Sequence, residues 1–112
     1  MQPRDWRDRV RDIIAAAESA RRFAADLPLE QFARDEQRRS AVAYQLMILG
    51  EAAGALPPEV RERIRHFPWQ ELRGLRNRIA HAYFDLEPSI IWAIVQDDLP
   101  TVLAEIPRLL DE

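Results

Sequence analysis

Nine consecutive residues, from Leu75 to Tyr83, combine several types of side chain that could do chemistry. They include two arginines, the only asparagine, one of the two histidines and one of the two tyrosines. The guanidinium of Arg76 can bind a phosphate through two parallel hydrogen bonds and stays charged. His81 can exchange protons near neutral pH, while Asn77 and Tyr83 can hydrogen-bond and position a substrate. This set suits cleavage of an RNA phosphodiester, in which a base takes the 2′-hydroxyl proton and an arginine stabilises the charged phosphorane.

Other kinds of active site fit the sequence less well. No carboxylate-rich cluster has the spacing of metal ligands, so we expect neither a metal site nor a cofactor. The chain has no cysteine, which removes disulfides and thiolate metal sites. The serines at positions 19, 40 and 89 stand in no recognisable nucleophile setting. From the residues alone, Arg76 and His81 also fit an ordinary ion-pair network, so both readings stay open.

The charged residues are distributed unevenly along the chain. All 16 basic residues are arginine, and the net charge of −3 argues against unspecific coating of nucleic acid. Residues 61–78 nevertheless carry six arginines against Glu62 and Glu71, a net +4, whereas residues 83–112 carry a net −6. Such a basic segment indicates a surface for an anionic ligand, although a solvated helix face accounts for the charges equally well.

The hydrophobic pattern predicts an all-α protein that folds as a single domain over residues 1–112. Strand and hairpin signals are missing, and apolar residues recur at helical spacing along most of the chain. We expect an antiparallel bundle of four to five helices. Five helices are expected: one that starts near Pro3–Asp5, one over Asp35 to Ala55, one over Glu59 to His66, one from Trp69 to Ala80 or Tyr83, and one that starts near Glu87 and has a kink or restart near Asp98.

Helical geometry restricts how the chemical groups can act together. Arg76 and Tyr83 are seven residues apart and lie within about 20° of one another around a helix. His81 is five residues from Arg76 and therefore points about 140° away from it. One straight helix cannot aim Arg76 and His81 at the same atom. Either the helix deforms near Ala80, or two subunits share the site.

The sequence favours a soluble cytoplasmic protein that does not enter a membrane. It contains no run of 18 apolar residues and no N-terminal segment with the pattern of a secretory signal.

Residues 76–83 resemble the Arg-x4-His-x-Tyr signature of HepT-like toxins in the HEPN superfamily. Further segments resemble the same family in the same order, and together they cover nearly the whole chain: Ile48–Ala53, Pro68–Trp69, Tyr83–Asp85 and Asp97–Pro100. The resemblance implies a HEPN-like helical bundle that forms a homodimer and brings two Arg/His motifs into one cleft. It also implies a metal-independent endoribonuclease that acts as a toxin on RNA.

The resemblance also implies roles for individual residues. Arg76 and His81 would be catalytic, Asn77 would support them, and Arg73 and Arg78 would contact RNA phosphates. The expected partner is a cognate minimal nucleotidyltransferase antitoxin of the MntA kind, which would adenylylate Tyr83. Glu51 is a candidate partner for an arginine of the motif. The alternative is a non-catalytic helical adaptor that binds RNA or a nucleotidyltransferase.

Overall fold

Helices form almost all of the chain in the computed structural model, which describes residues 5–111. Their bounds are α1 (Trp6–Ala24), α2 (Leu29–Arg34), α3 (Glu36–Gly54), α4 (Pro58–Arg61), the 3₁₀-helix η1 (Glu62–Ile64), α5 (Trp69–Arg73), α6 (Leu75–Phe84), α7 (Pro88–Ala93), the π-helix η2 (Ile94–Asp98), α8 (Leu99–Glu105) and the 3₁₀-helix η3 (Ile106–Leu110). No strand occurs within residues 5–111, which confirms the all-α class. The helix start predicted near Pro3–Asp5 falls partly outside the described residues; α1 begins at Trp6, directly after this range, where the Asp5 carboxylate accepts a hydrogen bond from the backbone N–H of Arg7.

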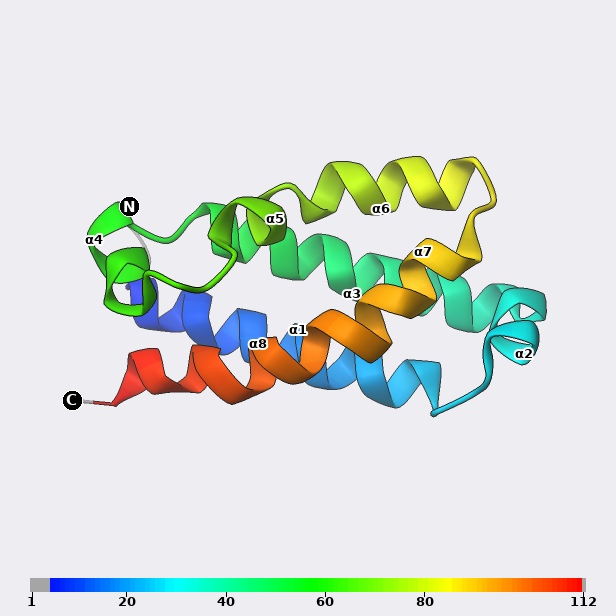
Figure 1. The fold of residues 1–112 in the computed structure, drawn as a ribbon, viewed down its shortest axis with the longest axis horizontal. Helices are drawn as coiled ribbons and strands as arrows, with labels where there is room; N and C mark the ends of the chain where they lie inside the picture. The colour runs from blue at the N-terminus through cyan, green and yellow to red at the C-terminus, as the bar shows by residue number, and fades with distance from the viewer. Residues whose placement is uncertain (1–4, 112) are drawn as a thin grey trace.

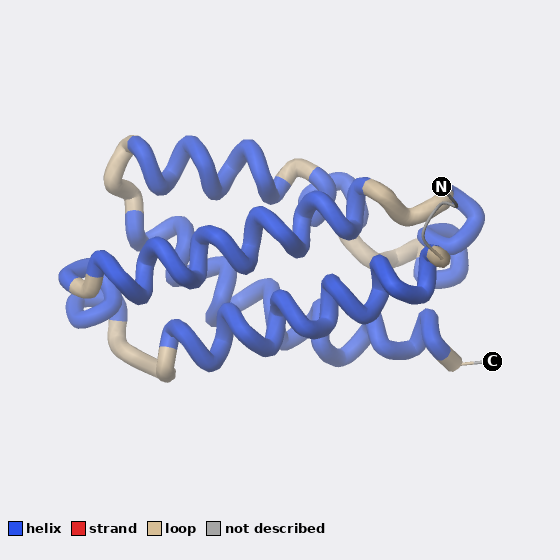
Figure 2. The backbone as a smooth tube through the Cα atoms, turned by 180° about the vertical axis from the view of Figure 1, so that it is seen from behind, coloured by secondary structure: helices blue, strands red, loops and turns tan. Residues whose placement is uncertain are grey.

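The helices pass back and forth along one axis. Figure 1 shows α1, α3, the pair α5–α6 and the run from α7 to η3 following one another in alternating directions. The loops gather mainly at the two ends of this bundle (Figure 2). Within residues 5–111, no helix is long and apolar enough to cross a membrane.

Helix α3 is the central element because it is apolar on more than one side. It packs against α1 on one side and against α5 and α6 on another. Its buried residues are Val42, Ala43, Leu46, Leu49, Gly50, Ala52 and Ala53. A helix with so wide an apolar surface must be covered by several neighbours. Each neighbour, α6 included, is therefore positioned by α3.

Two predicted helices are wrong in part. The helix expected from Trp69 onward is interrupted at Gly74, which ends α5 and precedes α6. Glycine has a low helix propensity, and the break allows the two helices to take different directions. The helix expected over Glu59–His66 is shorter, since α4 gives way to the 3₁₀-helix η1 at Glu62. The connection after α1 contains an unpredicted helix, α2, whose Phe32 is fully buried.

The predicted change near Asp98 is confirmed. Residues 94–98 form a π-helix, in which the backbone N–H of Leu99 bonds the carbonyl of Ile94, and α8 starts at Leu99. Pro100 has no N–H to donate, so regular α-helical bonding cannot continue through this position. The π-helix η2 has a wider turn than an α-helix and accommodates Pro100. The apolar face that covers α1 and α3 therefore continues from α7 into α8.

Candidate active site

Helix α6 buries one side and exposes the other. Its residues Leu75, Ile79 and Ala82 lie in the core. The polar residues of the motif face outward, and Arg76, Asn77, Arg78 and His81 are all exposed. The apolar side fixes the helix on α3, and the polar side is presented to solvent.

Gly50 determines how closely α6 approaches α3. A Cβ atom at this position would lie 3.0 Å from the backbone nitrogen of Arg76 and 3.2 Å from the Cβ of Leu75. The two helices therefore touch backbone to backbone at the start of the motif. The next residue, Glu51, forms an ion pair with the guanidinium of Arg76. This pairing confirms Glu51 as the partner of a motif arginine, and it leaves both side chains largely exposed.

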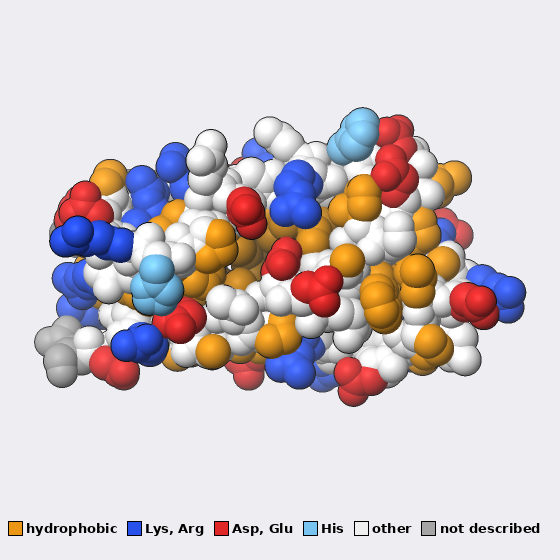
Figure 3. All heavy atoms as spheres, viewed as in Figure 1, with side chains coloured by type: hydrophobic (Ala, Val, Ile, Leu, Met, Phe, Trp, Pro, Cys, Tyr) orange, Lys and Arg blue, Asp and Glu red, His pale blue; other side chains and the backbone are white. Residues whose placement is uncertain are grey.

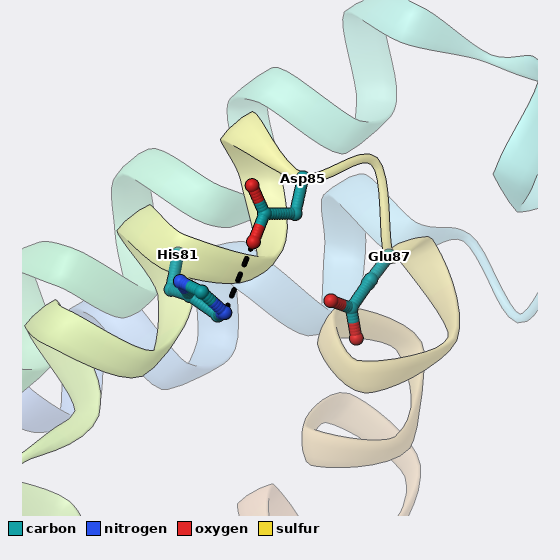
Figure 4. Close-up of side chains that lie close together, drawn as sticks. All are labelled: His81, Asp85 and Glu87. Atoms are coloured by element: carbon teal, nitrogen blue, oxygen red, sulfur yellow. Dashed lines mark ion pairs between the residues drawn. The ribbon is translucent and has the colours of Figure 1, made fainter.

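His81 pairs with a carboxylate one turn further along α6. Its Nε2 atom lies 3.0 Å from Oδ2 of Asp85 (Figure 4). Asp85 is the residue that caps the C-terminal end of α6. Asp85 is not among the site residues predicted from the sequence, although its spacing of four from His81 is the signal for such a pair. The carboxylate orients the imidazole, which remains accessible to a substrate.

Tyr83 is tied to the central helix. Its hydroxyl lies 2.7 Å from the hydroxyl of Ser40 on α3, and its ring is half-buried with its edge against Phe84. Ser40 precedes Tyr83 by 43 residues, and no local pattern indicates the contact. The phenol therefore has a fixed position between α6 and α3.

The structure does not bring Arg76 and His81 of one chain to a common partner. Helix α6 continues from Leu75 to Phe84, so the first of the two alternatives, a deformation near Ala80, does not occur. Arg76 is held by Glu51 on α3, whereas His81 is held by Asp85 at the end of α6. Of the two geometric alternatives, only a site shared between two subunits remains, and it stays a prediction.

Arg78 borders a small hollow between α5, α6 and the C-terminal helices. Apolar residues form much of its wall, and the charged residues at it are Glu71, Arg78 and Asp98. A hollow with hydrophobic walls and charged residues around it is visible in Figure 3. Burial raises the pKa of the Asp98 carboxyl above its ordinary value, while the positive charge of Arg78 acts in the opposite direction. Part of the positive field of Arg78 is thus offset by acidic neighbours.

Arg73 and Asn77 differ from Arg76 and His81 in having exposed side chains that no other described residue pairs with. Both are exposed, Arg73 on α5 and Asn77 on α6. Within residues 5–111, neither side chain forms a hydrogen bond or an ion pair with another residue. Their polar groups are available to a ligand on the outer side of the motif.

Comparison with known proteins gives consistent matches along the chain. The family described as "Ribonuclease HepT-like" matches residues 13–109. A protein of Methanocaldococcus jannaschii named "Putative RNase MJ1380" is 33% identical over 106 residues, which cover 95% of this chain and 97% of that protein. A protein of Thermococcus cleftensis named "Probable ribonuclease HepT" is 29% identical over 106 residues, covering 95% of this chain and 96% of its own length. No solved structure gives a significant match.

Proposed function

Because the chain belongs to the HepT-like ribonuclease family, we propose that it is a metal-independent endoribonuclease that acts as a toxin in the cytoplasm. The main support within the chain is the exposure of Arg76 and His81 on a single helix whose other side is fixed in the core. Neither side chain is needed for packing. Their position on the surface fits a role in binding and cleaving a phosphodiester.

The proposed reaction uses the 2′-hydroxyl of the RNA as the nucleophile. A base removes its proton, the 2′-oxygen attacks the adjacent phosphorus, and an acid protonates the departing 5′-oxygen. The products are a 2′,3′-cyclic phosphate and a 5′-hydroxyl. Arg76 stabilises the charge on the non-bridging oxygens, and His81 transfers protons. Asn77 orients the substrate, and Arg73 and Arg78 bind flanking phosphates.

A homodimer supplies the second proton-transfer group. One histidine cannot readily be both base and acid in the same step, and a two-fold axis would place a second His81 in the same cleft. The straight course of α6 supports this arrangement, because it directs Arg76 and His81 of one chain about 140° apart. Each protomer would then contribute different groups to a given phosphate.

The reaction can be tested with RNA oligonucleotides in EDTA. We expect the purified chain to cut RNA without added metal, to leave the same oligonucleotide intact when every ribose is 2′-deoxy, and to release 2′,3′-cyclic phosphate ends. A mock preparation from the same host controls for contaminating nucleases. Failure to cut any of a varied set of RNAs, or cutting only after Mg²⁺ is added, would contradict the proposal. RNA binding without cleavage would instead indicate the adaptor.

Regulation would act through Tyr83 and a separate minimal nucleotidyltransferase antitoxin. Tyr83 and Arg76 lie within about 20° of one another around α6 and roughly 10 Å apart along it. An adenylyl group on the Tyr83 oxygen would therefore bring a phosphate and a bulky nucleoside to the side of the helix that holds Arg76. It would also replace the hydroxyl proton of Tyr83, so that Tyr83 could no longer donate a hydrogen bond to Ser40. RNA phosphate would be excluded by charge and by volume.

Co-expression with the cognate nucleotidyltransferase is expected to add one AMP to Tyr83. Mass spectrometry of the peptide that contains Tyr83 measures the addition, and Tyr83→Phe should remove it. Tyr44 is the other tyrosine of the chain and is highly exposed, so Tyr44→Phe is the matched control and should leave the modification unchanged. An inhibited complex with unmodified Tyr83 would mean that the antitoxin acts by occlusion.

A further inference from the structure

Three potential metal ligands meet where α6 ends and α7 begins. One ligand atom from each of His81, Asp85 and Glu87 can be chosen so that all three lie within 4.8 Å of one another. Figure 4 shows the imidazole and the two carboxylates at this corner, with His81 and Asp85 in direct contact. One nitrogen and two oxygen donors form a mixed ligand set, which differs from a purely acidic cluster.

The turn between the helices holds Glu87 against the end of α6. Leu86 has a left-handed backbone with φ of 56°, and the backbone N–H of Glu87 donates to the carbonyl of Ala82 at 2.8 Å. This is the bonding of a Schellman motif, which reverses the chain directly after a helix. Glu87 therefore returns toward His81 although it belongs to the next element.

The negative charges of the Asp85 and Glu87 carboxylates have few positively charged partners in the described part of the chain. Within residues 5–111, the only ion pair of Asp85 is with His81, and the Glu87 carboxylate has neither an ion pair nor a hydrogen bond. The C-terminal end of α6 adds partial negative charge at the same place. A cation at this corner would relieve the repulsion and interact favourably with the helix end.

We propose that His81, Asp85 and Glu87 bind a divalent transition-metal cation, best matched by Zn²⁺, and that binding inhibits the nuclease by occupying His81. Zinc takes imidazole nitrogen and carboxylate oxygen at about 2.0–2.2 Å, which separates two ligand atoms of a tetrahedral site by about 3.3–3.6 Å. The observed 3.0 Å between Nε2 of His81 and Oδ2 of Asp85 is a few tenths of an ångström shorter than this separation, so a small rotation of the exposed Asp85 side chain would admit the ion. Rotation of the Glu87 side chain brings the third ligand, and water completes the coordination.

The inhibitory half of this inference rests on the proposed function. A nitrogen whose lone pair is bound to a metal can neither accept nor donate a proton, so the imidazole would lose its role in catalysis. Zinc would thus be an inhibitor and not a cofactor. Removal of trace zinc by EDTA would maintain or increase RNA cleavage.

Calorimetric titration of the untagged chain with zinc chloride tests the site without reference to activity. We expect one Zn²⁺ per chain, no comparable binding of Mg²⁺, and affinities at least about tenfold weaker in His81→Ala and in Glu87→Gln. His66 is the matched control, because its side chain is as exposed as that of His81 and lies 3.9 Å from Glu105. His66→Ala should bind zinc like wild type. Equal affinity in all variants would overturn the site.

An RNA cleavage assay with zinc added after removal of EDTA tests the inhibition. Glu87→Gln is expected to cut RNA in EDTA at the wild-type rate and to require at least about tenfold more zinc for the same inhibition. Inhibition of this variant at the wild-type zinc concentration would overturn the inhibitory role. If wild type cuts no RNA at all, the proposed function fails, while the calorimetric result for the metal site stands by itself.

Discussion

His81→Ala is expected to lower RNA cleavage in EDTA by about 10²–10⁴-fold, the usual contribution of a positioned acid or base. The side chain is mostly exposed and contacts Asp85 at the surface, so its removal should leave the fold unchanged. His66→Ala is the matched control, since both histidine side chains are 72% exposed and both lie beside a carboxylate. Initial rates on one RNA oligonucleotide measure the effect. Equal loss of activity in both variants would assign His81 no chemical role.

The same variant tests whether two histidines act in one cleft. After subunit exchange of equal amounts of wild type and His81→Ala, about one quarter of the dimers contain two His81 residues and about one half contain one. If cleavage needs both, the mixture should retain about one quarter of the wild-type rate at equal total chain. If each protomer cuts independently, it should retain about one half.

Gly50→Val is expected to lower the free energy of unfolding by about 2–3 kcal/mol. The first added carbon already meets the backbone nitrogen of Arg76 at 3.0 Å, and a backbone atom cannot rotate away as a flexible side chain can. Helix α6 would have to move outward, which would separate Arg76 from Glu51. The melting temperature should fall by roughly 8–15 °C. Denaturant unfolding and thermal melting, at a fixed protein concentration, measure the effect.

Gly54 is the matched control for Gly50. It lies one turn later on α3, and a Cβ at this position would meet nothing within 4 Å. Gly54→Val should therefore change the unfolding free energy by less than about 1 kcal/mol. Similar destabilisation by both substitutions would mean that loss of glycine from α3, and not the close approach of α6, causes the effect.

Periodicity predicted the parts of the fold that depend on one helix at a time. The all-α class and the interruption near Asp98 follow from apolar spacing and from the missing N–H of Pro100. The break at Gly74 was missed because a single glycine inside a helical pattern is often tolerated. Here both α5 and α6 pack on α3, and this tertiary packing, not local helix propensity, determines that the helix is interrupted at Gly74.

The candidate site was predictable only as a set of residues. The motif placed Arg76, His81 and Tyr83 on one helix, and their partners come from elsewhere: Glu51 and Ser40 lie on α3. The contact with Glu51 depends on the close packing at Gly50, and the contact with Ser40 depends on the register between α3 and α6. Neither distance can be obtained from spacing within one segment. The placement of Glu87 similarly requires the left-handed turn at Leu86, which has a branched residue where glycine is usual.

The left-handed turn at Leu86 makes the proximity of His81, Asp85 and Glu87 depend on folding. An L-residue with a side chain disfavours the left-handed conformation by about 1 kcal/mol, so Leu86 does not adopt it by local preference. The docking of α6 and α7 on the core imposes it. In the unfolded ensemble, residues 81, 85 and 87 are therefore rarely brought together. Any ligand that needs all three binds the native state selectively and, by mass action, stabilises that state by an amount that grows with the logarithm of the ligand concentration once this exceeds the Kd.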